Sequence, residues 1–105
     1  MKSYEHITQM ENIFDDHQAL IDQLEPLLEA FSEHRQKFNQ LADYYSSQQF
    51  LEDYDEANTP EFPKDIKCGV LSEDAVYNLL TDNYQIALRM LEIALSILKD
   101  ERIAS

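Results

Sequence analysis

Residues that make turns are scarce in this chain. Its 105 residues include one glycine and three prolines, whereas a β-sandwich or barrel carries turn signals about every 8–12 residues. A single glycine also excludes a glycine-rich phosphate-binding loop. What remains is long periodic chain, which favours helices. We therefore predict an all-α fold that forms a single helical domain over residues 1–105, a size at which a chain buries a modest core.

A second cysteine, a signal peptide and a long apolar run are also absent. Cys68 is the only cysteine, so an internal disulfide is excluded. The opening MKSYEHITQM has no apolar stretch of the kind that directs secretion. The most apolar window, residues 86–98, is too short to span a bilayer and contains Arg89 and Glu92. We expect a cytoplasmic protein that does not act at a membrane.

Basic residues are few and scattered. Eight Lys and Arg stand against 21 Asp and Glu, which gives a formal net charge of −13. No segment of the chain is basic. Because binding to a phosphate backbone requires clustered Lys or Arg to displace counterions, we expect neither direct nucleic-acid binding nor docking on anionic lipid.

The first part of the chain has the pattern of one long helix. Apolar residues recur in steps of three and four through residues 5–45, as on the core-facing stripe of an amphipathic helix. Pro26 removes a backbone donor within this stretch and presses on the preceding turn. No turn residues surround Pro26, and it falls opposite the stripe, so we predict a kink there rather than an end. The stripe includes Ile7, Met10, Phe14, Ile21, Leu24, Leu28 and Phe31.

The second part predicts a short helix, an ordered loop and a long C-terminal helix. Ser46 followed by Gln49 matches a capping box for a short helix near residues 48–57. Residues 58–71 hold two prolines and the glycine, which predicts a loop. Ser72 is a good N-cap for a helix that fades near Glu101. We expect this helix to pack antiparallel to the first, as a helical hairpin or bundle.

The C-terminal helix is more apolar than one partner helix requires. Within IALRMLEIALSIL, residues 86–98, only Arg89, Glu92 and Ser96 are polar. A helix that is apolar nearly all round is buried on several sides. Its extra surface is covered either within the chain, by the short helix, the loop or a kinked-over part of the first helix, or by a second chain. We predict an interaction surface for a homodimer or another protein, formed by Leu88, Leu91, Leu95 and Leu98.

The densest negative charge lies in the predicted short helix. The run EDYDE supplies Glu52, Asp53, Asp55 and Glu56, which we add to the predicted interaction surface as the part that meets a basic partner. In a sharper version, the carboxylates stand in for the phosphates of nucleic acid and occupy the basic groove of another protein. The plainer interpretation is a solvated helix face.

An alternative function is small-ligand binding or catalysis in a pocket near the KCGVLSED loop. Tyrosines flank that loop and Cys68 lies within it. Lys64 and Lys67 would favour a reactive thiolate, but no histidine is near in sequence and free cysteines are usually packed. The residues of the predicted pocket are Tyr44, Tyr45, Tyr54, Cys68 and Tyr77.

The histidines do not make a metal motif. His6, His17 and His34 have no glutamate three residues before them, which a di-metal helical bundle requires. The HExxH zinc motif and a calcium loop are also missing from the sequence. We therefore assign no metal, no cofactor and no catalytic residue.

Two stretches carry a resemblance to a known family. The segments YYSSQQFLEDYDEA and PKDIKCGVLSEDAVYNLL resemble the bacterial family of domains of unknown function numbered 4298, and the similarity covers nearly the whole chain. The resemblance implies a small, mostly helical, cytoplasmic bacterial protein. It brings no activity, cofactor or site residue. From the residues, we predict a non-enzymatic module that associates with itself or with another protein.

Overall fold

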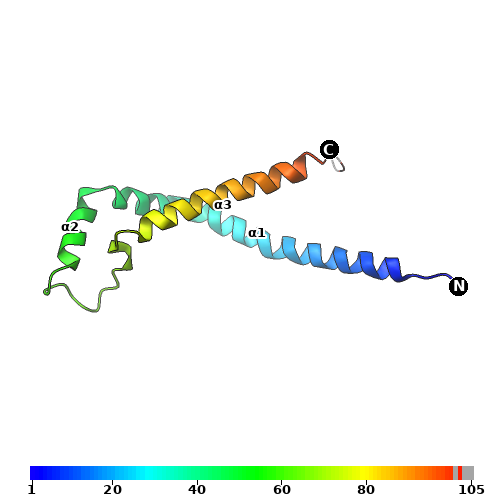
Figure 1. Ribbon diagram of the computed structural model, residues 1–105, viewed down its shortest axis with the longest axis horizontal. Coiled ribbons are helices and arrows are strands. Elements are labelled where there is room, and N and C mark those ends of the chain that lie inside the picture. Colours follow the sequence, from blue (N-terminus) through cyan, green and yellow to red (C-terminus); the bar gives the residue numbers. More distant parts are fainter. Residues whose placement is uncertain (101, 103–105) are drawn as a thin grey trace. The chain divides into compact units, whose positions relative to one another are not determined.

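The computed structural model describes residues 1–100 and 102, and this part of the chain is helical. It contains three α-helices and one short 3-10 helix, with no strand among the residues described (Figure 1). The all-α prediction is confirmed. The chain divides into two compact units, an N-terminal unit, Met1–Asn39, and a C-terminal unit, Gln40–Ser105. The single domain and the antiparallel packing of the long helices stay predictions.

Helix α1 spans Glu5–Tyr45 and is 41 residues long. These are the predicted bounds, and the helix continues through Pro26, so the proline does not end it. Its N-terminus begins after Ser3, whose Oγ accepts a hydrogen bond from the Glu5 backbone nitrogen at 3.3 Å. Every residue of the N-terminal unit is exposed except Phe38, which is half-buried. The periodic stripe therefore makes a helix whose apolar side chains stay uncovered within this unit.

Helix α2 spans Gln48–Ala57, as predicted, but its cap is Ser47 rather than Ser46. Ser47 has extended backbone angles, and its Oγ accepts a hydrogen bond from the Phe50 backbone nitrogen at 3.2 Å. The same hydroxyl donates to the Tyr44 carbonyl oxygen at 2.6 Å. Ser47 thus satisfies groups at the end of α1 and the start of α2 together, which Ser46 does not. The predicted capping box was wrong, because the cap is one residue later and the residue three positions after it is Phe50 rather than Glu or Gln.

The loop after α2 contains the 3-10 helix η1, Gly69–Leu71, and leads to helix α3, Ala75–Leu98. Both α2 and α3 contact η1. The Ser72 Oγ accepts a hydrogen bond from the Ala75 backbone nitrogen at 3.1 Å, the bond expected of a capping serine. The helical turns nevertheless begin at Ala75, later than predicted. The predicted end near Glu101 lies outside the described residues.

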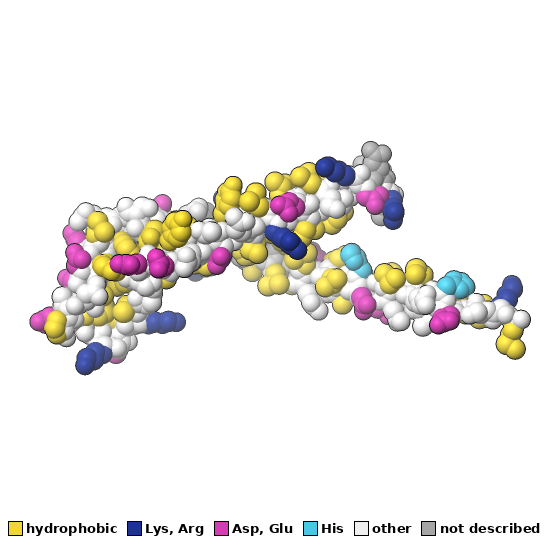
Figure 2. All heavy atoms as spheres, viewed as in Figure 1, with side chains coloured by type: hydrophobic (Ala, Val, Ile, Leu, Met, Phe, Trp, Pro, Cys, Tyr) yellow, Lys and Arg dark blue, Asp and Glu magenta, His cyan; other side chains and the backbone are white. Residues whose placement is uncertain are grey.

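Buried side chains are rare. Phe50, at 7% exposure, and Val76, at 2%, are the buried residues of the described part of the chain. Both lie in the C-terminal unit, on α2 and at the start of α3. Figure 2 shows hydrophobic side chains at the surface along α3. The helices are thus formed, but most of their apolar faces are not covered.

Candidate functional site

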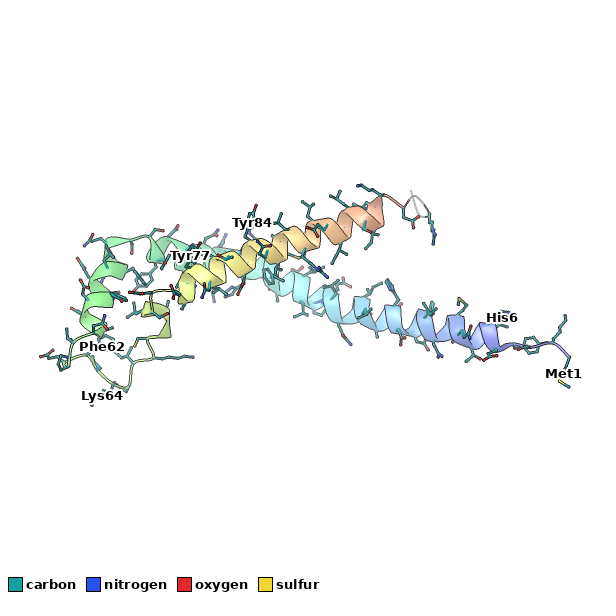
Figure 3. All side chains as sticks on the ribbon, in the orientation of Figure 1. Met1, His6, Phe62, Lys64, Tyr77 and Tyr84 are labelled. Carbon is teal, nitrogen blue, oxygen red and sulfur yellow. The ribbon has the colours of Figure 1, made fainter. Side chains whose placement is uncertain are left out.

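Four leucines of α3 form an exposed line that we call the leucine seam: Leu88, Leu91, Leu95 and Leu98. Their spacing of three, four and three residues places them on one side of the helix. Their exposed fractions lie between 37% and 75%. Tyr84, one turn before Leu88, extends the same side and is also exposed (Figure 3). The structure thus places the predicted apolar surface on one continuous, solvent-facing side of α3.

A neighbouring line of α3 is covered at its start. Val76 is buried, and Leu80 and Asn83 are half-buried. Continued toward the start of α3, the line of the leucine seam passes through residues 84, 81 and 77, and each of the three covered residues comes one position before one of these. Because successive residues of an α-helix are about 100° apart around its axis, the covered residues lie on the side next to the seam. The C-terminal unit therefore covers the first turns of one side of α3 and leaves the adjacent seam open.

The charged side chains of α3 are Asp82, Arg89 and Glu92. All three are exposed and none belongs to the leucine seam. The helix therefore brings little charge to an apolar contact. The seam is suited to burial against another apolar surface, since no charge would have to be desolvated with it.

An aromatic cluster lies at the other end of the C-terminal unit. The ring of Phe50 makes edge-on contacts with Tyr44 and Tyr45, with centroids 5.6 Å and 5.1 Å away. The Tyr54 ring lies 6.3 Å from Phe50, tilted by 31°. Pairs of this kind contribute about 0.5–1.5 kcal/mol each beyond the burial of their surface. The cluster fixes the turn between α1 and α2.

Asp53 is the polar centre beside this cluster. The Tyr44 hydroxyl donates to Asp53 Oδ2 at 2.6 Å, and Gln49 Nε2 donates to Asp53 Oδ1 at 2.9 Å. The hydrogen bond to the carboxylate, with burial and the nearby negative charge, raises the pKa of Tyr44 to about 12. The two donors, Tyr44 first, lower the pKa of Asp53. At neutral pH the pair is a neutral phenol bonded to a carboxylate.

Glu73 joins the segment before α3 to this cluster. The Tyr54 hydroxyl donates to Glu73 Oε1 at 3.3 Å, and the Tyr45 hydroxyl donates to the Glu73 carbonyl oxygen at 3.4 Å. The negative charge of Glu73 raises the pKa of Tyr54, and burial and the hydrogen bond add to this. Sequence reasoning missed Glu73 as the partner of these two tyrosines. No local signal reveals its role, since its partners lie 28 and 19 residues away.

The predicted pocket residues are brought together only in part. Tyr44, Tyr45 and Tyr54 gather around Phe50, so their grouping is explained by packing. Cys68 is half-buried at the residue before η1. Tyr77 is 60% exposed on α3 (Figure 3). A ligand site at these residues stays a prediction. Phe50 was missed as the centre of the group, although its spacing of four residues from Tyr54 places both on one side of α2.

The acidic residues of α2 differ from one another. Asp53 is half-buried and hydrogen-bonded, whereas Glu52, Asp55 and Glu56 are exposed. Within the described residues the one ion pair joins Arg102 Nε to Asp100 Oδ1 at 3.3 Å, so these three carboxylates have no basic partner there. A basic partner protein for this face stays a prediction.

The residues that the structure describes contain neither a metal-binding cluster nor a membrane-spanning helix. In that part of the chain no group of three or more His, Cys, Asp or Glu side chains is placed to hold a metal ion. No helix there combines the length and apolar character needed to cross a membrane.

Comparison with protein families identifies the family of this chain. A family profile with the description "Domain of unknown function (DUF4298)" matches residues 7–93, which includes most of α1, all of α2 and most of α3. The comparison with curated proteins finds no match.

Proposed function

Since the chain belongs to the DUF4298 family, whose description assigns no activity, we propose a function from the chain's own surface. The protein is a non-enzymatic helical module that associates with a second copy of itself through the leucine seam of α3. The observation that carries the proposal is the exposure of Leu88, Leu91, Leu95 and Leu98 on a single side of one helix. Contiguous exposed apolar patches of this kind mark interaction sites.

Several leucines must be buried to offset the free-energy cost of association. Fully burying one leucine side chain contributes about 1.5–3 kcal/mol. Association costs about 4–15 kcal/mol in lost translational and rotational freedom. One leucine would not offset this cost, whereas the seam supplies four leucines from each of the two copies. The proposal therefore depends on the whole seam.

Charge supports α3 as the contact helix. Two copies with a formal charge of −13 each repel one another. Among the three α-helices, α3 carries the fewest charged side chains: Asp82, Arg89 and Glu92. A contact through α3 brings the least like charge together, and added salt screens the repulsion between the remaining surfaces. We expect the dimer fraction to rise with salt.

The test is the molar mass in solution by light scattering, over a range of protein concentrations at low and high salt. The wild type is expected to form a dimer. The double variant Leu88→Glu/Leu95→Glu is expected to be a folded monomer with unchanged helical circular dichroism, because each dimer would have to bury four carboxylates.

The matched control adds the same two charges elsewhere on α3. Gln85 and Ser96 are exposed and lie outside the leucine seam, so Gln85→Glu/Ser96→Glu should leave the dimer mass unchanged. A wild type that stays monomeric at every concentration and salt would contradict the proposal. So would an unchanged mass in the leucine variant, which would remove this surface from consideration.

A further inference from the structure

We propose that the two α3 helices pair antiparallel, with Leu88 facing Leu98 of the second copy and Leu91 facing Leu95 of the second copy. This inference rests on the proposed function and names its partner surface and orientation. It follows from the spacing of the seam and from the distribution of charge in the C-terminal unit.

The spacing of the seam is the same in both chain directions. From Leu88 to Leu98 the steps are three, four and three residues, and they read identically in reverse. A two-fold axis at the level of residue 93 therefore places each leucine against a leucine of the second copy. Such an isologous contact uses the same surface on both copies and closes after two. Parallel pairing also matches leucines, so spacing alone does not fix the direction.

Charge decides the direction. Helix α2 and the loop lie at the end of the C-terminal unit where α3 begins (Figure 1), and both carry acidic residues. Parallel pairing would bring these residues of both copies together. They are Glu52, Asp53, Asp55, Glu56, Glu61, Asp65, Glu73 and Asp74.

Antiparallel pairing separates these two acidic regions. With the axis at residue 93, the two copies of Ala75 lie about 50 Å apart along the helices, at about 1.5 Å per residue. Repulsion between exposed charges is largely screened beyond about 8 Å at physiological salt. The antiparallel arrangement therefore buries the same leucines while removing most of the repulsion between the α2 regions.

Disulfide trapping tests the direction. In a Cys68→Ser background, Leu88→Cys and Leu98→Cys are made as separate variants, and each is confirmed as a dimer by light scattering under reducing conditions. In the antiparallel pair, the two copies of residue 98 lie about 15 Å apart along the helices, beyond the roughly 7 Å between Cα atoms that a disulfide spans. The mixture of the two variants should therefore cross-link on oxidation, and neither should do so alone.

A second measurement leaves the sequence unchanged. Cys68 is the only cysteine and lies just before η1, which contacts α3. A nitroxide spin label attached to Cys68 of the wild type reports, by pulsed electron paramagnetic resonance, the distance between the labels of the two copies. The antiparallel pair predicts more than about 40 Å, from the rise per residue of the helix, and the parallel pair predicts a much shorter distance.

The outcomes separate this inference from the function on which it rests. Cross-linking only in the mixture, with the long Cys68 distance, supports the antiparallel pair. A dimer in which each variant cross-links alone, in which nothing cross-links, or in which the Cys68 distance is short overturns it and leaves self-association standing. A wild type that is monomeric by light scattering overturns both.

Discussion

The two units of the chain have the same kind of helix and very different surroundings. In the N-terminal unit, Met1–Asn39, no residue is buried, and the side-chain hydrogen bonds are local, from Gln18 Nε2 to Asp22 Oδ1 and from the Glu5 backbone nitrogen to Ser3 Oγ. In the C-terminal unit, Phe50 and Val76 are buried, and hydrogen bonds reach across the loop to Glu73. Within the two units, buried side chains and hydrogen bonds between distant residues are thus concentrated where the chain turns.

This difference shows what apolar periodicity does and does not determine. The stripe of α1 and the seam of α3 have the same spacing of three and four residues, and both form helices. Stability of a helix in a protein comes mostly from packing of its apolar face. The pattern therefore predicts that an apolar face must be covered, but it does not identify the surface that covers it. Both units leave apolar faces available for association.

The largest expected effect comes from removing the centre of the aromatic cluster. Phe50→Ala deletes a ring that is 7% exposed and contacts three tyrosines. We expect a loss of about 3–5 kcal/mol in the free energy of unfolding of the C-terminal unit, the usual cost of a buried phenylalanine. Urea unfolding followed by near-ultraviolet circular dichroism of the tyrosines measures it.

The matched control is a phenylalanine of the N-terminal unit. Phe14 is 65% exposed on α1, so Phe14→Ala should change the same free energy by about 0.5 kcal/mol or less, as for most surface substitutions. Equal losses in the two variants would mean that the contrast between the units is wrong and that Phe14 is covered in solution.

A smaller effect is expected at the turn between α1 and α2. Ser47→Ala removes the hydroxyl that bonds to the Phe50 nitrogen and to the Tyr44 carbonyl, and the loss of an N-cap costs about 1 kcal/mol. Ser46→Ala, one residue earlier at an exposed position, should have little effect. Chemical unfolding of both variants tests the assignment, and a larger loss for Ser46→Ala would restore the cap predicted from the sequence.

Local signals predicted the helices, and contacts between distant residues were missed. The steps of three and four gave α1 its bounds, and the spacing of the leucines located the seam of α3. The choice between Ser46 and Ser47 depends on backbone angles at one turn, which two adjacent serines do not reveal. The hydrogen bonds from Tyr45 and Tyr54 to Glu73 depend on the path of the intervening loop. The sequence around each of the three residues therefore does not indicate these hydrogen bonds.

The smallest expected effect is a pH dependence confined to the C-terminal unit. The pKa of Tyr44 is raised from the usual 10.0 to about 12. A group with a raised pKa stabilises the fold fully below its unfolded value, so this contribution is present below pH 10.0 and is lost as pH rises toward about 12. The pKa of Asp53 is lowered from 3.8, so its contribution is present above pH 3.8 and is lost as pH falls through the lowered value.

Tyr44→Phe tests this dependence with little change in shape. It keeps the ring against Phe50 and removes the hydroxyl that donates to Asp53. The wild type should show one tyrosine that ionises near pH 12 by ultraviolet absorbance, and the variant should lack it. Because Gln49 still donates to Asp53, the loss of stability as pH falls through the lowered pKa of Asp53 should become smaller in the variant without disappearing. A variant whose unfolding midpoint falls from pH 10 to 12 as steeply as that of the wild type would show that the Tyr44–Asp53 hydrogen bond does not couple the fold to pH.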